Sequence, residues 1–448
     1  MKMLNKFKIK LKESNIVKNI VVLVSGVVIG YGISTLTLPI VSRVYTPAQL
    51  GEYDLILSVG NILINFVGLA LIIAIMIPNE DEEAIKICKV IRSSAVILLG
   101  IFMLGVYILE PYVHLFEVTT NYHWACWLMV FYVWTYNQQN LYYAFVNRKR
   151  MYRVLFWNPI FSAITNSLFS IIFGLWGWGT SGYLLGTILS YVICILHMRI
   201  RVNPFRGKHS VKELWTTLKN YRVYPLVQLP TNTISTVSTQ IPTQFLGRMF
   251  STAALGGYTM ACKLLSVPVS LLATPVNRVY YREAAEKKNR GENIGELCFN
   301  IIEKNVKLAI LPIGILVVFG RQITTIFLGQ SWEASGTYIS ILGILYLLKY
   351  CSSCVSGTFV VIGKQKVSLV CSICGLLLYL GCFIVAYFLN MSVIHTILFY
   401  AVTDGLYNFI NLLLCMIYTK FSIKRYLIFV LKYIFGSAIV IYGLYFII

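Results

Sequence analysis

Two stretches of this sequence read almost alike: Arg43-Val-Tyr-Thr-Pro-Ala-Gln-Leu-Gly-Glu-Tyr53 and Arg248-Met-Phe-Ser-Thr-Ala-Ala-Leu-Gly-Gly-Tyr258. Arginine, alanine, leucine, glycine and tyrosine occupy equivalent positions in the two copies, and each copy lies between two long apolar runs. A repeat of this length predicts two related helical bundles in one chain. That architecture is typical of membrane transporters rather than of membrane enzymes.

The composition places these bundles in a membrane. Of 448 residues, 58% are hydrophobic and 12% are charged, and the mean hydropathy is +0.73. Soluble domains carry about 25% charged residues, and a helix needs roughly 20 residues to cross the hydrocarbon core. Thirteen apolar runs, from 19–42 to 426–448, are predicted to be spans. The fold class expected is an all-α integral membrane protein with two six-helix bundles, related by a parallel repeat, and a thirteenth helix.

The spacing of these runs predicts five segments. Residues 1–17 form a basic amino-terminal segment, and residues 18–198 and 224–418 form the two six-helix lobes. Residues 199–223 form a polar linker between the lobes, and residues 419–448 form the additional helix. An even number of crossings separates the two repeat copies, so both lobes have the same orientation and the repeat axis is expected along the membrane normal.

The net charge of +21 predicts an orientation and not a nucleic-acid partner. Lysine and arginine cluster at the amino terminus and then in alternate loops only, which is the positive-inside pattern. The amino terminus is therefore expected in the cytoplasm, and the basic loops are expected to attract anionic lipid headgroups. The first apolar run is too long for the core of a signal peptide and is expected to remain as the first span.

Four cations lie in or beside the apolar runs. Lys263 and Lys349 lie within spans, and Arg43 and Arg248 end the first and seventh spans. A charge in lipid is costly, about 2.5–3.5 kcal/mol or more, and it often marks a substrate path. All four are candidates for binding an anion in a central cavity. The alternative for the two arginines is that their side chains extend to the interface.

Asp404 is the acidic residue placed well inside a span, in Ala401-Val-Thr-Asp404-Gly. A carboxylate at that depth is protonated, paired with a cation, or binding one. It is the candidate for coupling transport to H⁺ or Na⁺, and the alternative is a structural ion pair with Lys349. Glu52 and Asp54, at the start of the second span, are interpreted as solvated.

The fourth span is rich in amides and aromatic residues, including Trp134-Thr-Tyr-Asn-Gln-Gln-Asn140. Amides bind sugar hydroxyls, and aromatic rings stack on sugar faces. Amides also hold membrane helices together, and Tyr and Trp form interfacial belts. Helix packing is the favoured interpretation. Pro39, Pro230 and Pro242 in the first and seventh spans predict kinks, either as packing irregularities or as bends used in transport.

The motifs of common enzymes do not occur. The sequence has no G-x-S-x-G, H-E-x-x-H or Walker A motif, so no enzyme activity, cofactor or metal is expected. Cys351-Ser-Ser-Cys354 and Cys371-Ser-Ile-Cys374 have zinc-site spacing, but they lie in apolar runs, where cysteine is an ordinary small apolar residue. Without an ATP site, transport would draw on an ion gradient or on the substrate's own gradient.

Several motifs taken in order resemble one family, the polysaccharide-type flippases of the multidrug/oligosaccharidyl-lipid/polysaccharide exporter superfamily, which include O-antigen and capsule-unit translocases. The matching stretches are Tyr45-Thr-Pro-Ala-Gln-Leu-Gly-Glu-Tyr53, Ile77-Pro-Asn-Glu-Asp-Glu-Glu-Ala84, Tyr224-Pro-Leu-Val-Gln-Leu-Pro230, Leu255-Gly-Gly-Tyr258 through Pro268-Val-Ser-Leu271, and Phe327-Leu-Gly-Gln-Ser-Trp332-Glu-Ala-Ser-Gly336. The resemblance covers about residues 15–420.

This resemblance implies two lobes around a cationic cavity in the bacterial inner membrane. It implies translocation of undecaprenyl-pyrophosphate-linked oligosaccharide units from the inner to the outer leaflet by alternating access, in association with polysaccharide polymerase machinery. By position, Arg43 and Lys263 match cations of related flippases, whereas Glu52 and Asp54 replace a cation expected near the second helix. The alternatives are an ion-coupled small-molecule or drug antiporter of the same fold and, more distantly, a membrane glycosyltransferase.

Overall fold

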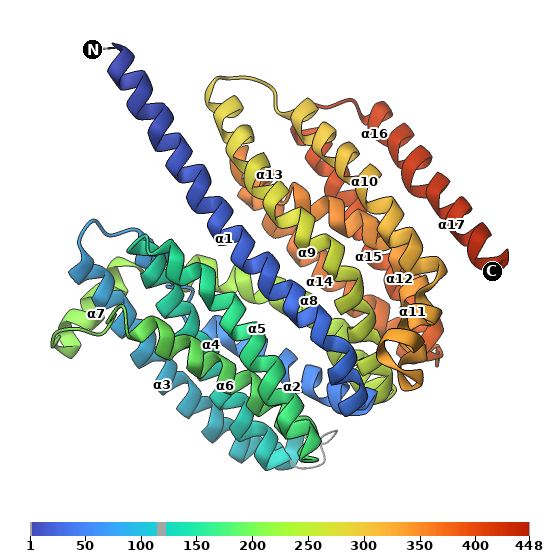
Figure 1. Cartoon of the computed structure of the whole chain (residues 1–448), viewed down its shortest axis with the longest axis horizontal. Coiled ribbons are helices and arrows are strands. Elements are labelled where there is room, and N and C mark those ends of the chain that lie inside the picture. Colours follow the sequence, from blue (N-terminus) through green and yellow to red (C-terminus); the bar gives the residue numbers. More distant parts are fainter. Residues whose placement is uncertain (1, 114–121, 448) are drawn as a thin grey trace. The chain divides into compact units, whose positions relative to one another are not determined.

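The computed structural model describes residues 2–113 and 122–447, and in these two ranges the chain is helical with short connections and has no strand. Figure 1 shows the helices in chain order, beginning with the long helix α1. The side chains of residues 1–21, which include the predicted basic segment 1–17, lie outside the described residues. The chain divides into two compact units. Unit 1 comprises Met1–Tyr45 and Ile56–Thr233, and unit 2 comprises Thr46–Leu55 and Ile234–Ile448.

The elements of the first half are α1 (Lys2–Val44), α2 (Pro47–Val67), η1 (Ile73–Met76), α3 (Asp81–Val113), α4 (Tyr122–Arg148), α5 (Tyr152–Leu175), α6 (Gly179–Arg199), α7 (Val211–Asn220) and η2 (Tyr224–Gln228). Those of the second half are α8 (Leu229–Met249), α9 (Thr252–Asn289), α10 (Gly295–Val318), α11 (Gly320–Leu328), η3 (Gln330–Trp332), α12 (Glu333–Cys354), α13 (Thr358–Val361), α14 (Gln365–Phe388), α15 (Val393–Tyr418), α16 (Ile423–Phe429), η4 (Val430–Phe435) and α17 (Gly436–Ile447).

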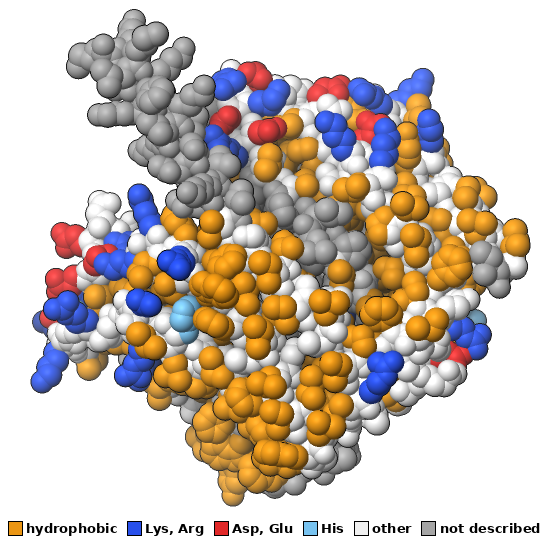
Figure 2. Space-filling model, viewed as in Figure 1, with side chains coloured by type: hydrophobic (Ala, Val, Ile, Leu, Met, Phe, Trp, Pro, Cys, Tyr) orange, Lys and Arg blue, Asp and Glu red, His pale blue; other side chains and the backbone are white. Residues whose placement is uncertain are grey.

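Many of these helices can cross a membrane. Among the described residues, 9 are long and apolar enough to do so, and the bent pair α10 and α11 makes up to 10. Of the thirteen predicted spans, the other three correspond to α4, α8 and α9, which do not meet these criteria. In α4 and α8, amide and hydroxyl side chains lower the hydropathy. Large apolar side chains are exposed, such as Leu36 (74%) and Ile439 (76%), and Figure 2 shows apolar side chains over broad areas of the visible face.

In unit 1, α1 packs closely on α5 through two glycines. A Cβ atom at Gly26 would lie 2.4 Å from the carbonyl oxygen of Phe156, and one at Gly30 would lie 2.9 Å from that of Pro159. Only glycine allows the two backbones to approach this closely. The hydroxyl of Tyr45, at the end of this pair of helices, donates a hydrogen bond to the Ser170 carbonyl at 2.6 Å.

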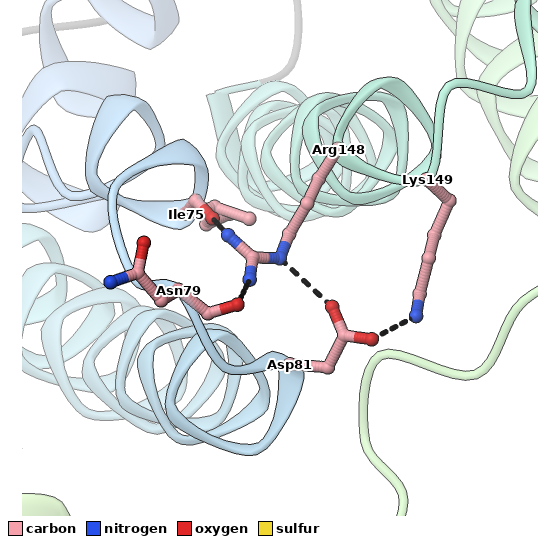
Figure 3. A network of polar contacts seen from close by, with 5 residues as sticks. All are labelled: Ile75, Asn79, Asp81, Arg148 and Lys149. Atoms are coloured by element: carbon pink, nitrogen blue, oxygen red, sulfur yellow. Dashed lines mark hydrogen bonds and ion pairs between the residues drawn. The ribbon is translucent and has the colours of Figure 1, made fainter.

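A polar network joins the start of α3 to the end of α4 in the same unit (Figure 3). The Arg148 guanidinium donates to the Asp81 carboxylate at 3.1 Å and to the backbone carbonyls of Ile75 and Asn79 at 3.1 and 3.2 Å. Lys149 forms a second ion pair with Asp81. Asp81, at the start of α3, thus binds two neighbouring cations.

The predicted linker contains an amphipathic helix, α7, which packs on the start of α3. The Ser210 hydroxyl caps α7 by accepting a hydrogen bond from the Glu213 backbone amide at 3.3 Å. After the helix ends, the Tyr221 hydroxyl donates to the Glu83 carboxylate at 2.9 Å. Burial, and then this hydrogen bond, raise the pKa of Tyr221 to about 12. A capped and anchored α7 makes this part of the linker an ordered segment of unit 1.

The sequence repeat forms a helix crossing in unit 2. A Cβ atom at Gly51 in α2 would lie 1.8 Å from the carbonyl oxygen of Thr252, and a Cβ atom at Gly256 in α9 would lie 1.9 Å from that of Pro47. These two contacts are equivalent under the repeat, because Pro47 aligns with Thr252 and Gly51 with Gly256. Small residues let membrane helices approach backbone to backbone, so the repeated glycines bring α2 and α9 together.

The carboxyl-terminal helices also belong to unit 2. Ile434 and Ile441 are part of its buried core, and a Cβ atom at Gly314 in α10 would contact Ile441 in α17 at 3.1 Å. The Tyr442 hydroxyl donates a hydrogen bond to the backbone carbonyl oxygen of Ser340 in α12 at 2.8 Å. The thirteenth predicted span therefore packs as an additional helix on the second bundle.

Pro39 lies inside α1 and Pro242 inside α8. The third proline, Pro230, is the second residue of α8, which begins directly after the π-helical turn Tyr224–Gln228. A π turn is a common cause of a local change in helix direction. Bending of these helices during transport stays a prediction.

Candidate functional site

Lys263 forms an ion pair with Asp54 in unit 2. The Lys263 ammonium, on α9, donates to the two carboxylate oxygens of Asp54, on α2, at 3.2 and 3.0 Å. It also lies 5.9 Å from the centre of the Tyr53 ring. Asp54 comes one turn after Gly51 and Lys263 two turns after Gly256, so the ion pair continues the glycine crossing along both helices. The interpretation of Asp54 as a solvated residue is therefore wrong.

Asp404 and Lys349 form a second ion pair in the same unit. The Lys349 ammonium, on α12, lies 3.7 Å from a carboxylate oxygen of Asp404, on α15. The other Asp404 oxygen accepts hydrogen bonds from the Tyr379 hydroxyl at 2.6 Å and from the Asn408 amide at 3.2 Å. The pairing that sequence offered as an alternative is present, and it is embedded in a larger hydrogen-bonded group.

The two pairs lie in one part of unit 2. Leu55, which follows Asp54 in the chain, belongs to the same buried cluster as Tyr379 and Ala401, which lie beside the second pair. Aromatic rings connect the helices here: Tyr258 and Tyr400 have centroids 6.2 Å apart, and Tyr400 and Tyr379 have centroids 5.6 Å apart. Tyr258 is the last residue of the second repeat copy, so the repeat leads directly into this cluster.

In both pairs the lysine is more accessible than its carboxylate. The side chain of Lys263 is 38% exposed against 14% for Asp54, and that of Lys349 is 41% exposed against 11% for Asp404. Each acid therefore neutralises a lysine whose side chain is more accessible than its own. Two such ammonium groups in membrane helices can bind a polyanion. Because each is paired with an acid, the empty protein avoids the free-energy cost of an uncompensated charge.

The two arginines of the repeat lie in different units. Arg43 belongs to unit 1 and Arg248 to unit 2, and both side chains are exposed. The Arg43 guanidinium donates to the Pro39 carbonyl at 2.8 Å, within its own helix. Their predicted contribution to binding at the outer mouth of a cavity stays a prediction.

Sequence reasoning missed three partners: Asp54, Tyr379 and Asn408. Asn408 follows Asp404 by one helical turn, which is a detectable signal. The repeat was the signal for Asp54. Because the repeated glycines set where α2 and α9 cross, they also determine that Asp54, one turn after Gly51, meets Lys263, two turns after Gly256. Tyr379 lies on another helix, α14, and one sequence alone does not indicate that α14 packs beside α15.

This arrangement defines a class: a multi-pass helical membrane protein with two bundles and charged pairs inside one of them. Solved structures of that class share the fold. A lipid II flippase, MurJ, in an inward closed conformation superposes with a TM-score of 0.72 at 13% identity, over 94% of this chain and 92% of that one. An inward-facing multidrug resistance MATE family transporter of the MOP superfamily gives 0.68 at 15% identity, over 88% and 96%.

The chain belongs to a family of polysaccharide biosynthesis proteins, whose model matches residues 40–337. A curated relative, the teichuronic acid biosynthesis protein TuaB of Bacillus subtilis (strain 168), is 27% identical over 134 residues. That match covers 30% of this chain and 27% of the length of the relative. The resemblance to a polysaccharide biosynthesis family and the predicted two-bundle α-helical fold are confirmed.

Proposed function

We propose that this protein is a flippase that moves undecaprenyl-pyrophosphate-linked oligosaccharide units from the inner to the outer leaflet of the bacterial cell membrane. The observation that carries the proposal is the pair of accessible lysines, Lys263 and Lys349, each neutralised by a less accessible acid within membrane helices. A pyrophosphate is a compact polyanion that such ammonium groups bind well. The family's place in polysaccharide biosynthesis supports a glycan on that pyrophosphate.

Substrate binding would then be an exchange of anions. In the empty protein Asp54 neutralises Lys263 at 3.0 Å. A pyrophosphate carries more charge than one carboxylate and competes for the same ammonium, which releases Asp54 from the pair. Because Asp54 is on α2 and Lys263 on α9, this exchange breaks the ion pair that links these two helices of the repeat. That change at the glycine crossing is the proposed trigger for alternating access.

Asp404 is the proposed site of coupling to H⁺ or Na⁺. Its carboxylate is buried and has two hydrogen-bond donors, Tyr379 and Asn408, and one cation, Lys349. Protonation of the carboxylate, or its binding to Na⁺, would weaken its attraction for Lys349 and make that ammonium more available to a phosphate. The coupling ion and the anion therefore favour each other's binding, so that the pair links ion occupancy to anion occupancy.

The orientation proposed follows from the charges. Basic residues occupy alternate loops, which places the amino terminus and the linker that contains α7 in the cytoplasm. Substrate therefore enters from the side on which lipid-linked units are assembled and leaves toward polymerase machinery on the other side. We propose a transporter without enzyme activity and without a nucleic-acid partner.

An ion-coupled drug antiporter of the same fold is the second candidate. The buried carboxylate Asp404 favours it, since a carboxylate in a membrane helix can exchange a proton for an organic cation. The pairing of that acid with Lys349 disfavours it, because an adjacent ammonium repels such a drug. Export of ethidium that depends on Asp404 in vesicles would support the antiporter and count against the flippase.

Lys263→Ala tests the flippase. We expect the variant to fold and reach the membrane but to lose most export of the glycan, because the anion loses its accessible ammonium. Lys307→Ala is the matched control: Lys307 forms an ion pair at 2.8 Å with Glu303 within one turn of α10, away from the cluster. Normal glycan export by Lys263→Ala, measured in cells lacking the native transporter, would exclude this lysine from the site.

A further inference from the structure

Unit 1 contains a cavity that the charged pairs do not use. It has a volume of about 620 Å³ and lies among α1, α4 and α5. None of its described lining residues is charged or a histidine. Six of its polar lining residues are Tyr31, Tyr136, Gln139, Asn140, Asn158 and Asn166. Ligand cavities are typically about 300–1,000 Å³, so the space suits one or more sugar rings.

Most amides of this cavity are held in fixed orientations by other parts of the unit. Gln139 donates to the Asn158 side-chain oxygen at 3.2 Å, and Asn158 in turn donates to the Cys194 carbonyl at 3.4 Å. The Ser170 hydroxyl donates to Asn166 at 3.0 Å. A polar wall fixed in this way loses little conformational entropy when it binds a ligand. The helix-packing role predicted for the amides of α4 therefore coexists with a lined cavity.

Two of the lining groups are available for a ligand. Asn140 has no hydrogen-bond partner among the described residues, although it lines the cavity. The Tyr136 ring is held by two neighbours, stacked with Tyr132 at 6.0 Å between centroids and edge-on to Tyr191 at 5.5 Å. The cavity thus offers an amide with both donor and acceptor groups next to a rigid aromatic ring.

We propose that this cavity binds the neutral sugar residues of the transported lipid, an inference that rests on the function proposed above. A phosphate or carboxylate would find no cation among the described lining residues, and an acyl chain would leave the Asn140 amide without hydrogen bonds, at about 1–3 kcal/mol. Hydroxyl-rich rings satisfy both kinds of group, since amides and hydroxyls bind sugar hydroxyls and tyrosine faces pack on sugar rings. The proposed glycan site lies wholly within unit 1.

The test compares two lipids on one set of variants in nanodiscs. The first lipid is the glycan-bearing undecaprenyl pyrophosphate extracted from cells that lack the transporter, and the second is undecaprenyl pyrophosphate without a sugar. Asn140→Leu removes the amide at similar volume and breaks no hydrogen bond within the described chain. Gln138→Leu is the control, because Gln138 is an amide of α4 next to these residues in the chain but does not line the cavity.

We expect the wild type and Gln138→Leu to bind the glycan-bearing lipid about tenfold more tightly than the sugar-free lipid, roughly the effect of one or two hydrogen bonds. Asn140→Leu loses this preference and keeps its affinity for the sugar-free lipid. Lys263→Ala binds both lipids more weakly and keeps the preference for the glycan-bearing lipid. An unchanged preference in Asn140→Leu, or none in the wild type, overturns the glycan site. Unaltered binding of both lipids by Lys263→Ala overturns the proposed pyrophosphate site instead.

Discussion

The glycine crossing of the repeat makes a quantitative prediction about stability. In Gly51→Ala the new methyl group would lie 1.8 Å from the Thr252 carbonyl oxygen. A carbon and an oxygen without a covalent bond approach to about 3.3 Å, so α2 and α9 must separate locally by about 1.5 Å. Overpacking of this kind costs about 1–3 kcal/mol, and we expect a value near the upper end because two helix backbones, and no flexible side chain, must move.

Alanine also favours the helix by about 1 kcal/mol over glycine, so the net loss expected for Gly51→Ala is about 2 kcal/mol. Gly256→Ala should behave in the same way, because its methyl group would lie 1.9 Å from the Pro47 carbonyl oxygen. One separation of the helices relieves both contacts. The double variant should therefore lose clearly less than the sum of the single losses, with a coupling of about 1–2 kcal/mol.

Thermal unfolding in detergent measures these effects as apparent melting temperatures, at one heating rate because unfolding of such proteins is often irreversible. Gly100→Ala and Gly381→Ala are matched controls, since a Cβ atom at either position meets nothing within 4 Å. The controls should melt at the wild-type temperature or slightly above it, and both crossing variants several degrees below. Equal melting of Gly51→Ala and Gly100→Ala, or additive losses in the double variant, would refute a single backbone-to-backbone crossing.

Two further predictions concern the polar networks. Arg148→Ala should lower the free energy of unfolding by about 2–3 kcal/mol, and Lys149→Ala by less than about 1 kcal/mol. The melting temperature of Arg148→Ala should therefore fall much further. The reason is that Arg148 is 10% exposed and binds two backbone carbonyls besides Asp81, whereas Lys149 is 37% exposed; equal losses in the same melting assay would contradict this. Asp404→Asn should make glycan transport in vesicles insensitive to imposed H⁺ and Na⁺ gradients, while Tyr379→Phe should reduce the sensitivity in part. Full gradient dependence in Asp404→Asn would exclude that carboxylate from coupling.

The architecture follows largely from hydropathy and from the repeat. Long apolar runs predict helices because every backbone polar group must be satisfied within the lipid, and the run at 426–448 indeed overlaps a further apolar helical segment, Ile423–Tyr445. Hydropathy was a weaker guide to α4 and α8, whose amides and hydroxyls face other parts of the protein. Their polarity reflects helix packing and cavity lining, which hydropathy alone does not separate.

The candidate site was predictable only in part. Lys263, Lys349 and Asp404 were identified because each is a charge within an apolar run, and the cost of such a charge makes it informative. Asp54 was misinterpreted because it lies near the end of its run, where a charge can reach water. Its pairing with Lys263 depends on how closely α2 and α9 cross, and that distance is fixed by backbone packing at Gly51, outside the reach of charge patterns.

The central claim is that this chain moves a lipid-linked glycan between leaflets, and a reconstituted flipping assay tests it most directly. Vesicles containing the purified protein would carry fluorescently labelled, glycan-bearing undecaprenyl pyrophosphate in both leaflets, and a reductant that does not cross the membrane would bleach the accessible label. We predict bleaching of nearly all the label with the wild-type protein, under an H⁺ or Na⁺ gradient, and of the outer-leaflet fraction alone with Lys263→Ala or without protein. Bleaching limited to the outer leaflet with the wild-type protein, under every gradient tried, would contradict the account.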